Sequence, residues 1–179
     1  VPVTMGPDEA ARELAPRLSA LAGVRATASS GEAGARPGVP VVTIDGYSGS
    51  GKSTLAAALT PLLPGWQVLH LDDWYPGWDG LAEGAHIARR IAADLRGGRA
   101  SSYEAWDWEA GITGATIRVP LAPTIIEGCG AIEAEADLVI WIADPGEDER
   151  RSRALARDGQ TYAPHWQRWA DQDLGRSLP

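Results

Sequence analysis

The sequence predicts an α/β fold with three layers, in which helices cover both faces of a mostly parallel central sheet. Four short runs of β-branched and other apolar residues lack the polar alternation of a half-exposed strand, so they are typical of buried strands. Stretches with apolar residues three or four positions apart, the spacing of a helix, separate these runs. At about 150 residues per domain, the 179 residues form one domain with a short extension.

Each predicted strand is a short, mainly apolar run, and the four cover residues 41–45, 67–71, 123–127 and 138–142. The four predicted helices fall within residues 1–22, 53–63, 81–95 and 146–157, and in the first of them apolar residues recur at roughly helical spacing. Residues 99–120 show neither pattern. We therefore expect an irregular segment there, with an edge strand only over residues 116–119.

The first 39 residues are predicted to be an N-terminal helix, capped by Asp8, and a flexible linker. Residues 26–40 are small, polar and rich in glycine and proline, a composition typical of a mobile connection. The domain that contains the four strands is predicted to run from residue 40 to residue 179.

The charge and the cysteine content limit the partners and the compartment. The net charge is −8, and the field of so acidic a protein repels nucleic acids and anionic membranes. No apolar run approaches the roughly 20 residues that span a bilayer. Cys129 is the only cysteine, so an internal disulfide is excluded and a cytoplasmic location is expected.

Residues 46–54 read GYSGSGKST and match the phosphate-loop pattern G-x-x-x-x-G-K-[ST] between a predicted strand and a predicted helix. Glycines let successive backbone N–H groups point at an anion, and the helix that follows adds its positive end. Lys52, the only lysine among 16 basic residues, supplies charge for the terminal phosphates, and the Ser53 hydroxyl can bind Mg²⁺. The predicted nucleotide contacts in this segment are Gly46, Ser48, Gly49, Ser50, Gly51, Lys52, Ser53 and Thr54.

Other nucleotide-binding classes fit the sequence less well. GTPases read guanine with an N/T-K-x-D motif, which needs a second lysine, and transporter ATPases carry an LSGGQ-type signature that is absent here. Ring ATPases and helicases usually need a longer chain. Small kinases remain as the class of suitable size.

Two acidic positions follow predicted strands. Asp72 and Asp73 follow the second strand, where open α/β sheets place ligand groups, and a carboxylate there can take the proton of a hydroxyl acceptor. The alternative is that either residue caps the next turn. Glu127 ends the third strand and is predicted to hold Mg²⁺ or its water shell, unless it is only a solvated strand end.

Further candidates are weaker. Arg150, Arg153 and Arg157 share one helix face and could neutralise the transferring phosphoryl group, or pair with the acidic residues 147–149. Tryptophans at 74, 78, 106 and 108 could form an aromatic wall for an acceptor ring, or belong to the core. His70 is expected to be a core histidine and Cys129 a small buried filler.

Over residues 40–170 the chain resembles the uridine kinase and phosphoribulokinase branch of P-loop kinases, above all actinobacterial uridine kinase-like ATP-binding proteins. The phosphate loop is one point of resemblance. LDDWY resembles the family's D-S-F-Y segment, whose aspartate is the catalytic base and maps onto Asp72. Trp106-Asp107-Trp108 resembles a Y-D-F stretch whose aspartate binds acceptor hydroxyls, IIEG resembles the Mg²⁺-associated E-G, and the arginines from 150 to 157 resemble the helix that leads into the lid.

The resemblance implies a P-loop NTPase fold and an ATP- and Mg²⁺-dependent kinase that phosphorylates a hydroxyl of a nucleoside-like or other small acceptor. It implies an acceptor region at about 72–118 and a lid at about 150–170. Asp72, Lys52 and Arg153 would be catalytic, Ser53 and Glu127 would hold the metal, and Arg150 and Arg157 would contact the nucleotide. The implied acceptor contacts are Asp72, Asp73, Trp74, Tyr75, Asp107 and Trp108.

Two alternatives stay open. A nucleoside monophosphate kinase would need arginines near the acceptor, and Arg89, Arg90 or Arg99 could serve. A nucleotide-binding ATPase or switch would have no small acceptor at all. The family's histidine and arginine after Y-D-F are replaced by Glu109-Ala110-Gly111. The expected partners are a nucleotide and a small acceptor, and the oligomeric state stays open between a monomer and a dimer.

Overall fold

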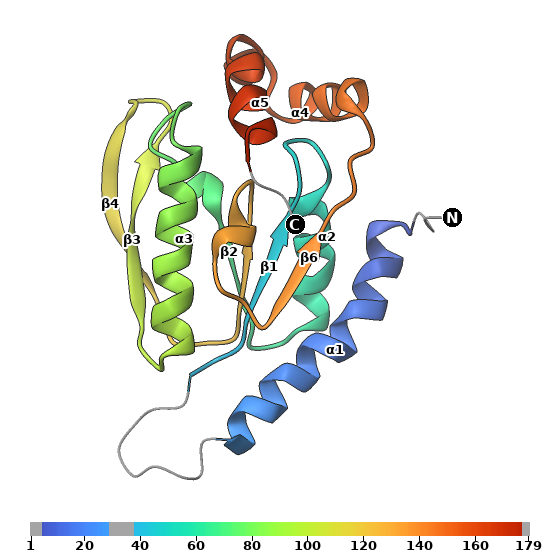
Figure 1. Ribbon diagram of the computed structural model, residues 1–179, viewed down its shortest axis with the longest axis vertical. Coiled ribbons are helices and arrows are strands. Elements are labelled where there is room, and N and C mark those ends of the chain that lie inside the picture. The colour runs from blue at the N-terminus through green and yellow to red at the C-terminus, as the bar shows by residue number, and fades with distance from the viewer. Residues whose placement is uncertain (1–4, 29–37, 177–179) are drawn as a thin grey trace.

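The computed structural model describes residues 5–28 and 38–176. A four-stranded parallel sheet lies at its centre, in the order β2-β5-β1-β6 (Figure 1). Its strands are β1 (Val41–Asp45), β2 (Gln67–His70), β5 (Thr124–Glu127) and β6 (Leu138–Trp141). All four strands predicted from the apolar runs are present, each within one residue of its predicted ends.

Helices cover both faces of this sheet. One face packs against α1 (Pro7–Ala28) and α2 (Lys52–Leu59), and the other packs against α3 (Leu81–Arg96) (Figure 1). Because consecutive residues of a strand point to opposite faces, Val42 joins the core cluster on the α1 and α2 side, whereas Val41 joins the cluster on the α3 side. The predicted three-layer α/β fold is confirmed.

The prediction of an irregular segment over residues 99–120 is wrong. The chain there forms an antiparallel hairpin of β3 (Ser101–Asp107) and β4 (Ile112–Val119), beside α3 (Figure 1). Every residue of β4 except Val119 is exposed. A strand with so little buried surface does not need the apolar alternation from which strands are recognised, so its sequence carries only a weak signal.

The last two helices lie over the carboxyl end of the sheet. The chain leaves β6 into α4 (Glu147–Tyr162), which contains a kink at Gly159, and then into α5 (Trp166–Leu174) (Figure 1). Trp166 and Trp169 of α5 are buried in the same core cluster as α3. The C-terminal helices are thereby packed onto the edge of the sheet at which the phosphate loop begins.

Four short 3-10 helices complete the described chain: η1 (Thr60–Leu62), η2 (Leu71–Asp73), η3 (Ala131–Glu133) and η4 (Ala163–His165). Most of the predicted linker falls at residues 29–37, outside the described residues. Within the described ranges, no helix is both long and apolar enough to cross a membrane.

Candidate active site

The phosphate loop connects β1 to α2 in a backbone conformation that requires glycine. Gly51 caps α2 at φ 109°, and Gly49 has φ 80°, both in the left-handed region. A Cβ atom added to Gly49 would also lie 2.2 Å from the carbonyl oxygen of Arg150. The start of α4 therefore packs directly against the loop, and this approach excludes any side chain at position 49.

Lys52 is held inside the loop. Its side chain is 7% exposed, and its ammonium donates hydrogen bonds to the carbonyl oxygens of Gly46 (2.8 Å) and Tyr47 (3.0 Å). Burial alone would lower the pKa of Lys52, but the surrounding carboxylates, Asp173 and Glu127 first among them, raise it above its ordinary value. Lys52 therefore stays a cation in the site.

Glu127 lies beside the loop because of the strand register. In the parallel ladder Glu127 pairs with Ile44 of β1 on one side and with His70 of β2 on the other. Its carboxylate is 3% exposed and lies 2.6 Å from the Nδ1 atom of His70. Burial would raise the pKa of Glu127, but the His70 hydrogen bond, the charge of Lys52 and a hydrogen bond from Ser53 lower it. Glu127 is a buried, ionised carboxylate and not a solvated strand end.

The expectation that His70 is a core histidine is wrong. Its side chain is 45% exposed and forms an ion pair with Glu127. The alternating direction of strand side chains gave no sign of this contact, because it joins residues of two different strands. A pairing of β2 with β5 is what brings the two together.

The two aspartates after β2 have different surroundings. Asp72 is exposed and lines the cavity next to the phosphate loop, and its carbonyl oxygen accepts a 2.8 Å hydrogen bond from the Trp108 indole. The Asp73 carboxylate lies 3.5 Å from the Tyr103 hydroxyl, on the side of the hairpin, and it does not line the cavity. Only Asp72 of this pair lines the cavity that the phosphate loop also lines.

A cavity of about 830 Å³ joins these groups. Part of its wall consists of the phosphate loop, Asp72, Glu127 and Cys129. The arginines at its edge are Arg153 and Arg157 of α4. Its aromatic residues are Tyr75, Trp78, Trp108, Tyr162 and Trp169. The cavity thus has a polar end at the phosphate loop and an aromatic wall.

The aromatic wall centres on Trp78. Its ring lies nearly parallel to the rings of Tyr162 and His165, with ring centroids 5.3 Å and 4.4 Å apart, respectively. The Trp108 ring is tilted against it, with the centroids 4.7 Å apart. Tyr162 and Trp169 were not among the predicted site residues. The group of aromatic residues after residue 160 was the one sequence feature that could have indicated their place in the cavity. These residues lie far from the other motifs along the chain, so the sequence did not connect them with the site.

Besides Asp73, three predicted side-chain contacts outside the phosphate loop lie elsewhere. Trp74 is 1% exposed and donates its indole N–H to Gly84, so it belongs to the core rather than the cavity. Asp107 accepts hydrogen bonds from the backbone of residues 109 and 110 and does not line the cavity, so it caps its own turn. Arg150 is 3% exposed, pairs with Asp144 and packs against the outside of the phosphate loop.

Tyr75 and Arg153 both line the cavity and both also form contacts within the protein. Tyr75 lines the cavity, but it is 1% exposed and its hydroxyl donates to the Cys129 carbonyl oxygen at 2.7 Å. Arg153 pairs with Glu149 one turn away at 2.8 Å and still borders the cavity. Cys129 is buried as expected, and burial raises the pKa of its thiol to about 12, so it stays protonated.

The pair of His70 and Glu127 predicts a pH-dependent stability. The hydrogen bond to Glu127 raises the pKa of His70 above its ordinary value of 6.5. The pair should therefore add its full contribution to the free energy of unfolding below about pH 6.5. This contribution is lost as the pH rises through the raised pKa of His70. In urea denaturation of the metal-free protein, His70→Gln should flatten the fall of the unfolding free energy between about pH 6 and pH 9. His86→Gln, at an exposed position of α3, is the control, and an unchanged profile for His70→Gln would contradict the assignment.

Two solved structures share this fold. One is a possible uridine kinase from Bacillus stearothermophilus, 21% identical, with a TM-score of 0.50 over 90% of this chain and 92% of that chain. The other is a candidate fructose transport system kinase from Silicibacter sp. TM1040, 21% identical, with a TM-score of 0.50 over 90% of this chain and 96% of that chain. No model of a known protein family matches the sequence, and no curated protein is significantly similar to it. The likeness shows that the chain has the α/β fold of these two proteins.

Proposed function

We propose that this protein is a small-molecule kinase that uses ATP and Mg²⁺ and transfers the γ-phosphoryl group to a hydroxyl. The observation that carries the proposal is that Asp72 lines the same cavity as Lys52 and Glu127. A phosphate loop with its lysine holds the triphosphate, and a carboxylate across the cavity can accept the proton of an alcohol. The acceptor oxygen then forms the new bond to phosphorus while the bond to the leaving ADP breaks.

The residues beside the loop fit a magnesium ion. Mg²⁺ prefers oxygen ligands and usually keeps several waters, with one or two protein groups and the phosphates completing its shell. The Ser53 hydroxyl and the ionised carboxylate of Glu127 line the cavity together. When bound, the ion would neutralise charge on the β- and γ-phosphates. Lys52 and the loop amides would orient the same phosphates.

Two arginines of α4 support a role for this helix in closing the cavity over the nucleotide. Arg153 and Arg157 of α4 both line the cavity. Arg153 is exposed, and the ion pair described for it is with Glu149. An arginine that reaches the transferring phosphoryl group would stabilise its charge. We propose this role for Arg153, with Arg157 on the nucleotide.

The surroundings of the acceptor favour a neutral alcohol over a phosphate. Of the described residues that line the cavity, the arginines are those of α4. The arginines that a monophosphate acceptor would require are engaged elsewhere: Arg89 with Glu133, Arg90 with the backbone of Ser102, and Arg99 with Asp94. The aromatic wall suits an acceptor with a planar or apolar part.

A panel of acceptors tests the proposal. ATP turnover would be measured with Mg²⁺ alone and with neutral nucleosides, sugars and vitamin-like alcohols, and with nucleoside monophosphates. Stimulation by a neutral alcohol, with the phosphorylated product seen by mass spectrometry, is the expected result. Stimulation by monophosphates alone would favour the nucleotide kinase, and turnover that no acceptor changes would favour an ATPase or switch.

Glu127→Gln should raise the Mg²⁺ concentration for half-maximal turnover by about 10–100-fold, the usual range for a residue that binds or orients a metal shell. The amide keeps the size of the side chain but removes the charge that attracts the ion. Titration of Mg²⁺ at fixed ATP measures the shift. Glu133→Gln, a change to an exposed carboxylate paired with Arg89, should leave the titration unchanged. Equal titrations for Glu127→Gln and the wild type would refute the metal role.

A further inference from the structure

The C-terminal helices hold one residue of the phosphate loop by all of its polar groups. The backbone N–H of Ser48 donates a 2.8 Å hydrogen bond to the Asp173 carboxylate of α5. The Ser48 hydroxyl is hydrogen-bonded to the Tyr162 hydroxyl at 2.9 Å, and the Ser48 carbonyl oxygen accepts from Arg150 at 3.4 Å. These partners lie more than 100 positions away along the chain, so the contacts are entirely a product of the fold.

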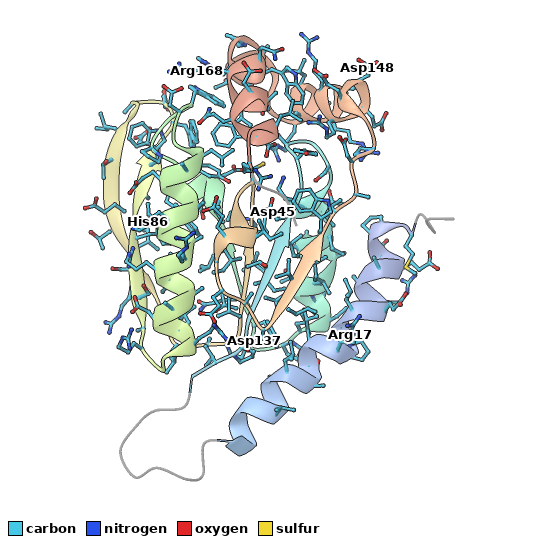
Figure 2. The ribbon with its side chains drawn as sticks, viewed as in Figure 1. Arg17, Asp45, His86, Asp137, Asp148 and Arg168 are labelled. Atoms are coloured by element: carbon cyan, nitrogen blue, oxygen red, sulfur yellow. The ribbon has the colours of Figure 1, made fainter. Side chains whose placement is uncertain are left out.

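Asp173 is itself fixed by a buried ion cluster. Its side chain is 1% exposed, and its second oxygen accepts a 2.9 Å hydrogen bond from the Nε atom of Arg176, with which it forms an ion pair. Arg176 also donates to the carboxylate of Asp45, the last residue of β1, at 2.8 Å. Asp45, labelled in Figure 2 at the carboxyl end of the sheet, accepts as well from the backbone N–H of Gly46, the first residue of the loop, at 2.6 Å. The cluster thus holds α5 to both Gly46 and Ser48.

One arginine offsets part of the negative charge of this cluster beside the phosphate site. Two buried carboxylates beside the loop would oppose an incoming triphosphate, and an unpaired buried charge is costly. The Arg176 guanidinium lies between the two and neutralises one of them. Asp173 does not line the cavity, although Ser48 does. Asp173 therefore approaches the loop from behind the nucleotide position and not as a competitor for it.

The same helix also holds the segment that follows Asp72. Gln172, the neighbour of Asp173, donates its side-chain amide to the Trp78 carbonyl oxygen at 2.7 Å, and Arg168 forms an ion pair with Asp79. One face of α5 thus contacts the phosphate loop and another contacts the aromatic wall of the acceptor end. Movement of α5 would disturb both ends of the cavity.

We propose that Asp173 is a positioning residue for the phosphate loop: through Ser48 it holds the loop in its nucleotide-binding shape, and it makes that shape depend on the docking of α5. The inference rests on the proposed function for its effect on nucleotide affinity. A loop that is already ordered loses less conformational freedom on binding, so affinity rises without a new contact to the ligand. Asp173 does not line the cavity, so the role proposed for it is exerted through Ser48 and not on the substrates directly.

Mg²⁺-ATP binding to the wild type and to variants of α5 tests the effect on affinity. Asp173→Ala should raise the Kd for Mg²⁺-ATP about 10–100-fold, because a hydrogen bond to a charged group is lost. The kcat at saturating substrate should change by less than about threefold, because the substitution weakens the binding of the ground state and the transition state equally. Asp173→Asn keeps a carbonyl oxygen for the Ser48 N–H but loses the acceptor of Arg176, so it should restore part of the affinity. Asp171→Ala removes an exposed carboxylate of the same helix, paired only with Gln167 among its described contacts, and is the matched control.

Hydrogen exchange of the nucleotide-free protein tests the contact independently of any activity. Exchange in the peptide over residues 46–54 should accelerate in Asp173→Ala and, by less, in Tyr162→Phe, which removes only the hydroxyl bonded to Ser48. Tyr162→Phe also serves if Asp173→Ala does not fold. Affinity and exchange that match those of Asp171→Ala would overturn the inference, as would an Asp173→Asn variant as impaired as Asp173→Ala. If the wild type fails to bind Mg²⁺-ATP, the proposed function is wrong. The exchange experiment would still test the contact between Asp173 and Ser48, because it is done without nucleotide.

Discussion

Asp72→Asn should lower kcat by about 10²–10⁴-fold, the usual contribution of a general base. The asparagine keeps the shape of the side chain and its place in η2 but cannot take the proton of the acceptor hydroxyl. The backbone carbonyl that Trp108 contacts is unchanged, so the wall of the cavity should stay in place. Steady-state kinetics with the acceptor found in the panel would give kcat, and calorimetry would show Mg²⁺-ATP affinity within about threefold of the wild type.

Asp73→Asn is the matched control for this experiment. It is the same change at the next position, on a carboxylate that lies near Tyr103 and outside the cavity. Its effect on kcat should be much smaller. The reverse ranking would mean that Asp73 is the base, and the absence of any effect at both positions would mean that transfer needs no base, as expected for a phosphate acceptor.

Lys52→Ala should reduce ATP turnover by at least about 10²–10³-fold, the range for removal of a group that stabilises the transition-state charge. The ammonium is the cation that the phosphate loop itself supplies, and it is enclosed by the carbonyl oxygens of Gly46 and Tyr47. No other lysine exists in the chain to replace it. Turnover and Mg²⁺-ATP binding would both be measured, since the lysine contributes to each.

The burial of Lys52 makes a control for folding necessary. The hydrogen bonds lost with the ammonium leave two carbonyl oxygens and the Cys129 sulfur without this donor, which can cost stability. Circular dichroism and the thermal midpoint would establish that the variant is folded at the assay temperature. Lys52→Arg retains a cation and should preserve the fold better than activity, because a planar guanidinium does not replace a compact ammonium. Full turnover in a folded Lys52→Ala protein would sink the kinase proposal.

The sequence by itself predicted those elements whose conformation depends on residues close together along the chain. The strand at residues 41–45, the loop up to Lys52 and the start of the following helix all carry their own signals, since buried parallel strands must be apolar on both faces and a tight phosphate loop must contain glycine. The position of Glu127 at a strand end was visible for the same reason. These motifs predicted the fold class and the phosphate-binding end of the cavity.

The tertiary structure alone decided the contacts between distant segments. The register of β2 against β5 pairs His70 with Glu127, and the packing of the C-terminal helices brings Asp173 to Ser48 and Tyr162 to the aromatic wall. It also buried Trp74, which sequence alone could not distinguish from an exposed tryptophan of the site. A periodicity records which side of an element faces the core, but it does not record which other element lies there, because that depends on how all the layers pack together.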